Sequence, residues 1–289
     1  MNEVNPFKDI FQLIADMPPA DEDKASELKR SLTAISAMVE TDHEAQRQAI
    51  WYQSWSQAAV PERPTIVVMV TATVGDEDVV EKASQYIDLH NRAGGLASYA
   101  ATNVGAGLSL FELAPSMPFD PTKGGLGSKM AAGTFAYGME TSALGADLLA
   151  LTSKSFGAER YLVPLWQKIS MGTPFSADDV EDILCHQVGR DIPALMGAMA
   201  AARYQRIPVI MEGIAAHIAA YFLSCLHENG ASHIASARSP QWFHQHAFSV
   251  LAPSDNLVSS GVDCALASKV VGTRISMIQD LSGVLHDSA

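Results

Sequence analysis

Short apolar segments that alternate with helical segments restrict the fold of this sequence more than any other feature. Residues 65–71 (TIVVMVT) are rich in β-branched side chains and show no polar alternation, which is typical of a strand buried on both faces of a parallel sheet. Similar runs occur at residues 108–113, 147–151 and 208–211 and around 232–236. Helical patterns separate them, as at residues 79–92, 194–203 and 215–226. This alternation predicts an α/β fold with a parallel sheet covered by helices.

The first 60 residues show a different, purely helical pattern. Residues 21–40 begin with acidic residues and then carry apolar side chains at helical spacing, namely Leu28, Leu32, Ile35 and Met38. Residues 47–58 carry three aromatic side chains on a second predicted helix, which ends before Pro61 and Pro64. We therefore predict a helical arm over residues 1–60, which forms a small subdomain with a C-terminal helix, and a main α/β domain over residues 61–289.

The composition argues against several classes of protein. The formal net charge of −13 argues against a nucleic-acid partner, because binding to the phosphate backbone needs a basic surface. The three cysteines are widely spaced in apolar surroundings, which favours reduced thiols in a cytoplasmic protein over a disulfide framework. The start lacks the pattern of a secretory signal. The apolar stretch 209–226 is interrupted by Glu212 and His217, so we read it as a strand end and a buried helix and expect no membrane span.

Candidate ligand-binding segments follow from the predicted sheet. In open parallel sheets, ligands bind beyond the carboxyl ends of the strands. The segments that would lie there are residues 71–78, 112–127, 152–160, 212–215 and 236–246.

Several of the segments at or near these strand ends carry recognisable patterns. Residues 206–213 read RIPVIMEG, residues 138–140 read GME before GADLLAL at 145–151, and AGG at 93–95 precedes VGA at 104–106. Weaker patterns are VGRDI at 188–192 and Arg238-Ser239 with His244. These five patterns resemble segments of the nicotinate-nucleotide:dimethylbenzimidazole phosphoribosyltransferase (CobT) family. In the same order as above, the family segments are R-I-P-V-L-L-D-G, G-M-E … G-A-D-L-L-G-L-G-E, A-G-G-A-A-I-N … V-G-A, G-G-F-E-I and H-R-S-x-E-P-G-H. The resemblance runs in the family's order from residue 65 to the C-terminus.

The resemblance implies a Rossmann-like three-layer α/β/α domain with a small helical subdomain from the chain ends, usually as a homodimer. It implies transfer of a phosphoribosyl group from nicotinate mononucleotide to the nitrogen of a benzimidazole base, in synthesis of the cobamide (vitamin B12) lower ligand. That reaction needs a carboxylate to take the proton of the base, an apolar slot for the flat base, and backbone donors for the phosphate. We expect no cofactor, and no metal because no Cys-x-x-Cys or His-Glu-x-x-His spacing occurs.

The catalytic carboxylate of the family has no direct counterpart here. Aligning residues 265–267 (ALA) with the family's A-L-A puts Ser260 where its G-E-G-S-G-A segment has Glu. A serine has no useful basicity near neutral pH. Asp263 is either a relocated base or a loop or helix-cap aspartate. Glu112, which aligns with a strand-end Asp of the family, is the second candidate for the catalytic carboxylate.

The phosphate loop is also altered. The family's G-E-M-G-I-G-N-T-T aligns with residues 152–160 (TSKSFGAER). This segment keeps Gly157, has Ser153 in place of the acid, and carries Lys154 and Arg160, which either attract an anion or are simply solvated. The Gly-rich loop that follows in the family is missing, and residues 72–76 (ATVGD) are shorter than the family's base slot.

Further ligand-binding positions come from the same resemblance. Glu140 and Glu212 match or conservatively replace family acids, with Gly213 beside the second, and Arg238 and Ser239 match the late segment. The alternative for the two acids is capping of strands and helices next to a pocket.

Two functions fit this pattern. The first is a phosphoribosyltransferase that uses nicotinate mononucleotide or a related nucleotide, with a different acceptor and a relocated base. The second is a catalytically silent paralogue that binds a nucleotide or pairs with an active subunit, as a homodimer or in a heteromer. The missing Glu and the altered phosphate loop favour the second.

Overall fold

One parallel sheet forms the centre of the molecule. The computed structural model describes residues 5–36, 42–74, 78–92, 94–237 and 260–286. Within them, five parallel strands are ordered β2-β1-β3-β4-β5. They are β1 (Pro64–Ala72), β2 (Gly107–Glu112), β3 (Leu148–Phe156), β4 (Val209–Met211) and β5 (Ile234–Ser236). Each coincides with an apolar run of the sequence, so the predicted α/β fold is confirmed.

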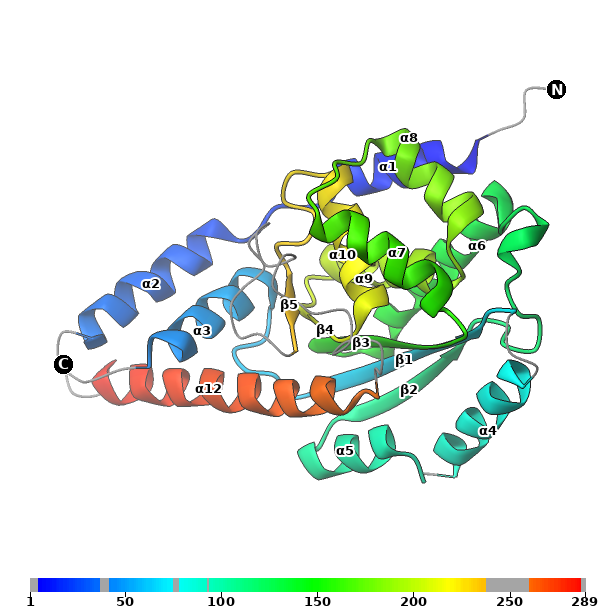
Figure 1. Cartoon of the computed structure of the whole chain (residues 1–289). Coiled ribbons are helices and arrows are strands. Elements are labelled where there is room, and N and C mark those ends of the chain that lie inside the picture. The colour runs from blue at the N-terminus through cyan, green and yellow to red at the C-terminus, as the bar shows by residue number, and fades with distance from the viewer. Residues whose placement is uncertain (1–4, 37–41, 75–77, 93, 238–259, 287–289) are drawn as a thin grey trace.

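Helices cover both faces of the sheet in three layers (Figure 1). Because side chains alternate along a strand, Val67 and Met69 of β1 enter one core, while Ile66, Val68 and Val70 enter the other. The first core includes side chains of α1 (Pro6–Ala15), α6 (Gly127–Met139), α7 (Glu159–Ser170), α8 (Ala177–Asp182), α9 (Asp191–Tyr204) and α10 (Ile214–Leu226). The second includes side chains of α2 (Glu22–Ser36), α3 (His43–Trp55), α4 (Val79–Asn91), α5 (Leu96–Val104) and α12 (Val262–His286).

Helices from the two ends of the chain lie together on the second face. α2, α3 and α12 contact one another, and α12 also contacts β1, β3 and β4. Cys264, Ala265 and Ile275 of α12 are fully buried there. α1 packs instead on α6 and α10. The division into residues 1–60 and 61–289 stays a prediction.

β3 is longer than the sequence predicted. The polar residues after Leu151 indicated a loop, but residues 152–156 pair in parallel register with residues 68–72 of β1. The strand ends at Gly157, which has a positive φ of 75°. A Cβ at this position would lie 2.7 Å from the carbonyl oxygen of Thr73, so the backbone conformation and the close approach both require glycine.

The apolar stretch 209–226 consists of β4 and the largely buried α10, as predicted. Among the helices that the structure describes, none combines the length and the apolar character needed to cross a bilayer.

Two glycines bring α6 and α9 into close contact. A Cβ at Gly138 would lie 1.9 Å from the carbonyl oxygen of Ala194, and one at Gly197 would lie 1.9 Å from that of Phe135. The two helix backbones therefore approach each other more closely than larger residues would allow. α6 and the turn before α9 line one side of the pocket described below.

Candidate functional site at the carboxyl edge of the sheet

The carboxylate of Glu212 connects β4 to α12. Glu212 directly follows β4 and is only 3% exposed. Its Oε1 accepts hydrogen bonds from the backbone N–H of Ser260 (3.0 Å) and Gly261 (3.3 Å), and its Oε2 accepts one from Cys264 (2.9 Å). A carboxylate at the positively polarised start of a helix is stabilised by these donors and by the helix dipole. Glu212 therefore caps α12 and holds its first turn against the sheet.

The start of α12 lies over the middle of β1. A Cβ at Gly261 would lie 3.2 Å from the Cβ of Ala97 and 3.5 Å from Cγ2 of Val68. Ser260, which the sequence aligned with the family's carboxylate, is half-buried, and its Oγ lies 3.4 Å from the backbone nitrogen of Val262. Asp263 is half-buried in the first turn of α12, where a negative charge favours the helix dipole.

Glu112 and Lys154 flank Val70 at the end of the sheet. Val70 of β1 is the register partner of Glu112 in β2 and of Lys154 in β3. Register partners in a parallel sheet point to the same face, and neighbouring strands are about 4.8 Å apart. Both side chains therefore belong to the face covered by α12, on either side of Val70. Glu112 is exposed, and the Lys154 ammonium lies 5.3 Å from the ring centroid of Phe156.

Ser153 points to the opposite face, where it joins a buried network. Its hydroxyl lies 3.2 Å from that of Ser155, which donates to Oδ2 of Asp191 at 2.6 Å. The Tyr161 hydroxyl donates to Oδ1 of Asp191 at 2.8 Å. Asp191 is completely buried. Burial raises the pKa of its carboxyl group, although the bonds from Ser155 and Tyr161 lower it in part.

The two cations predicted near the phosphate therefore belong to different elements. Arg160 is exposed in the first turn of α7, beyond the turn at Gly157, whereas Lys154 lies in β3. The positive φ of 90° at Gly213 reverses the chain between Glu212 and α10. Arg238 and Ser239, together with His244, lie outside the described residues.

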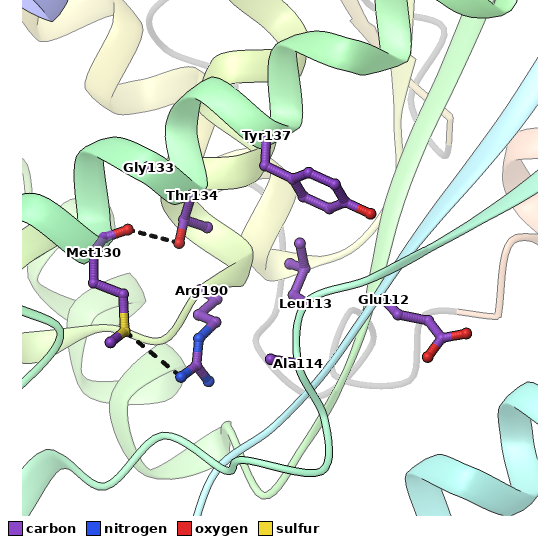
Figure 2. Close-up of a pocket in the computed structure, with 8 residues that line it drawn as sticks. All are labelled: Glu112, Leu113, Ala114, Met130, Gly133, Thr134, Tyr137 and Arg190. Carbon is purple, nitrogen blue, oxygen red and sulfur yellow. Dashed lines mark hydrogen bonds between the residues drawn. The ribbon is translucent and has the colours of Figure 1, made fainter.

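A pocket of about 470 Å³ opens between the end of β2, α6 and the turn before α9 (Figure 2). It is lined by Glu112, Leu113, Ala114, Met130, Gly133, Thr134, Tyr137 and Arg190. Burial raises the pKa of the Tyr137 hydroxyl, and the carboxylates of Glu140 and Glu112 raise it further. Two of the predicted acids, Glu112 and Glu140, therefore both influence the hydroxyl of Tyr137.

Arg190 and Asp191 were not predicted from the sequence as functional residues. A usable signal existed, because Arg190 is a cation where the similar G-G-F-E-I segment has an apolar Phe. Among the described residues, no group of three His, Cys, Asp or Glu side chains is arranged to hold a metal ion.

Comparison with known proteins gives consistent matches. A family model described as "Phosphoribosyltransferase" matches residues 166–275. The nicotinate-nucleotide–dimethylbenzimidazole phosphoribosyltransferase of Allorhizobium ampelinum is 28% identical over 269 residues, which cover 79% of this chain and 78% of that protein. The protein of the same name from Brucella canis is 24% identical over 272 residues, or 79% of each chain.

Solved structures agree on the fold. The crystal structure of CobT from Thermus thermophilus superposes with a TM-score of 0.69 at 13% identity, and covers 88% of this chain and 96% of that one. A second structure of the enzyme from the same organism gives a TM-score of 0.70 at 13% identity, with 90% and 96% covered. At this identity the likeness establishes the three-layer α/β fold.

Proposed function

Because this chain is a divergent member of the nicotinate-nucleotide–dimethylbenzimidazole phosphoribosyltransferase (CobT) family, we propose that it transfers a phosphoribosyl group from nicotinate mononucleotide, or a related nucleotide, to a benzimidazole-type base in cobamide synthesis. The observation that carries the proposal is the row Glu112–Val70–Lys154 across the carboxyl edge of the sheet, on the face that α12 contacts. Such edges are where parallel α/β sheets bind ligands.

Glu112 is our candidate for the proton acceptor. In the reaction, the unprotonated ring nitrogen of the base forms a bond to C1′ of the ribose and the other ring nitrogen loses its proton, while nicotinate leaves with the electrons of the old C1′–N bond. The acceptor must therefore be a carboxylate that can reach the base. Glu112 is exposed and has no ion pair with any described residue. Glu212 already accepts three backbone N–H groups. Asp263, in the first turn of α12, is the second candidate.

Lys154 is our candidate for the phosphate. The donors of Ser260, Gly261 and Cys264 at the start of α12 are already bonded to Glu212, so a phosphate gains little from them. Lys154 lies in the same row as Glu112, and its ammonium supplies a compact positive charge. Arg160, Glu140, Ser153, Gly157, Gly213, Arg238 and Ser239 stay predicted ligand-binding positions.

Two observations favour the second candidate function, a silent paralogue. The sequence aligns Ser260 with the family's carboxylate, and residues 152–156, which it aligns with the family's phosphate loop, form a strand. A paralogue of this kind would bind the nucleotide, or pair with an active subunit, without turnover. A cytoplasmic homodimer, or a heteromer completed by a partner chain, is part of the same proposal.

A chromatographic assay for nicotinate released from nicotinate mononucleotide, with dimethylbenzimidazole present, separates the two functions. For a transferase, Glu112→Gln should lower kcat by roughly 100-fold or more, as expected when a general base is lost. Asp263→Asn should have a much smaller effect. Glu27→Gln, which changes an exposed acid of α2 that belongs to no predicted site, is the matched control and should stay within about twofold of the unaltered protein.

Two results would contradict the proposal, the first for the role of Glu112 and the second for the transferase function itself. Full activity of Glu112→Gln would remove Glu112 as the proton acceptor. Binding of the mononucleotide by the unaltered protein without release of nicotinate would favour the silent paralogue.

A further inference from the structure

Arg190 carries a positive charge into the pocket on the α6–α9 side of the sheet. Figure 2 shows its side chain at one end of the pocket and the Glu112 carboxylate directed away from it at the other. No described carboxylate lies within ion-pair distance of Arg190. Partial burial lowers the pKa of its guanidinium, which still remains charged near neutral pH.

The guanidinium keeps donors for a ligand. An Arg side chain has five N–H donors in a planar fork. NH1 donates to the carbonyl oxygen of Met117 at 2.8 Å, and NH2 lies 3.6 Å from the sulfur of Met130, a weak acceptor. The described protein groups therefore leave most donors of Arg190 without a strong acceptor. A planar fork of this kind matches the two oxygens of a carboxylate or phosphate.

The turn that carries Arg190 is held firmly on both sides. The next residue, Asp191, is bonded to Ser155 and Tyr161 in the buried network. The preceding residue, Gly189, has no room for a side chain, since a Cβ there would lie 2.6 Å from the Tyr161 hydroxyl. The guanidinium thus starts from a fixed backbone, which lowers the entropy that a ligand would lose on binding.

The rest of the pocket is suited to a flat, apolar body. Tyr137 and Met130 are both partly exposed on α6, and the Tyr137 ring lies 5.6 Å from that of Phe111. Gly133 lies between them on the same helix. A Cβ at this position would have no neighbouring atom within 4 Å, so the space beside it is open. A volume of about 470 Å³ is within the range of small-molecule sites.

We propose that this pocket is a second site, which adjoins the transfer site of the α12 side at Glu112, and that it binds a small planar organic anion through Arg190. The anionic group is a carboxylate or a phosphate bound by the guanidinium, and the flat body lies against Tyr137 and Met130. The charge comes from Arg190, which stands where the similar family segment has Phe. Neither Lys154 nor any transfer chemistry takes part.

Isothermal titration with three probes tests the ligand class without requiring turnover. Benzoate, phenyl phosphate and benzamide share a flat ring and carry a carboxylate, a phosphate or no charge. Benzoate or phenyl phosphate should bind at least tenfold more tightly than benzamide, because charge-assisted hydrogen bonds are the stronger ones. The tighter of the two anions identifies the group that the site prefers. Equal binding of all three probes would overturn the proposal.

Titration of single-residue variants with the same probes tests whether the anion binds in this pocket. Arg190→Gln should weaken the preferred anion roughly tenfold or more, and Arg190→Lys should weaken it less. Gly133→Leu should block binding by filling the open space, whereas Gly133→Ala, the matched control, should keep it. Lys154→Gln, in the proposed transfer site, should leave probe binding unchanged. Unaltered binding in both Arg190→Gln and Gly133→Leu would overturn the proposal, whatever the transferase assay shows.

Discussion

Two buried carboxylates, Glu212 and Asp191, lie on opposite faces of the sheet near its carboxyl edge, and they are satisfied in different ways. Glu212 accepts three backbone N–H groups from the first turn of α12. Asp191 accepts from the hydroxyls of Ser155 and Tyr161 and from the backbone nitrogen of Ile192. The first attaches a whole helix to the sheet, while the second fixes a single turn.

The difference assigns separate tasks to the two faces. On the α12 side the buried acid caps a helix, and the two residues that we propose for the transfer, Glu112 and Lys154, lie on either side of Val70. On the α6–α9 side the buried acid fixes the turn from which Arg190 enters the pocket. Glu212, which the sequence aligned with a family acid, thus has a role in the packing of α12.

The largest expected effect is at Glu212. Glu212→Ala would leave three backbone N–H groups near the sheet without their acceptor, so we expect a loss of about 3 kcal/mol or more in the free energy of unfolding, measured by urea denaturation. Glu140→Ala, which removes an exposed acid, should change it by about 0.5 kcal/mol or less. A loss below about 1 kcal/mol for Glu212→Ala would mean that α12 does not depend on this cap.

A smaller effect is expected where α6 meets α9. Gly138→Ala would place a Cβ 1.9 Å from the Ala194 carbonyl oxygen, so the helices must separate, and we expect a loss of about 2–3 kcal/mol. Gly133→Ala on the same helix meets nothing within 4 Å and should stabilise the protein by up to about 1 kcal/mol. Thermal unfolding of the two variants compares them directly, and equal melting temperatures would contradict the close contact.

Asp191 should make stability depend on pH. Because its pKa is raised in the folded state, folded Asp191 holds its proton more tightly than the unfolded chain does. Its contribution to the free energy of unfolding is therefore complete below the pKa of the unfolded chain, about 3.9. That contribution is lost as the pH rises through the folded pKa, at up to about 1.4 kcal/mol per pH unit. Urea unfolding from pH 4 upward should show this loss in the unaltered protein and not in Asp191→Asn. Identical pH profiles would contradict the assignment.

The smallest stability effect is expected at Lys154. Its ammonium lies over the Phe156 ring, and such a contact near the surface contributes about 0.5–1 kcal/mol. Lys154→Gln should therefore unfold within about 1 kcal/mol of the unaltered protein, yet raise the KM for nicotinate mononucleotide. A changed KM without loss of stability separates a ligand-binding role from a structural one, and an unchanged KM would contradict the proposed phosphate contact.

The sequence predicted the strands well because each is a short, β-branched run without polar alternation. It misjudged the end of β3, since Ser153 and Ser155 look like loop residues and only pairing with β1 extends the strand. It placed an acid at the end of β4 but could not tell that α12, about 50 residues later, would take up that carboxylate. The Arg190 pocket was missed because β2, α6 and the turn before α9 meet only in the folded chain.

The most direct test of this account is a crystal structure of the protein with nicotinate mononucleotide bound. We predict density for the nucleotide on the α12 side of the carboxyl edge, with its phosphate at Lys154 and the bond to nicotinate within reach of Glu112. Density for the nucleotide in the Arg190 pocket, with the α12 side empty, would contradict the assignment of the transfer site.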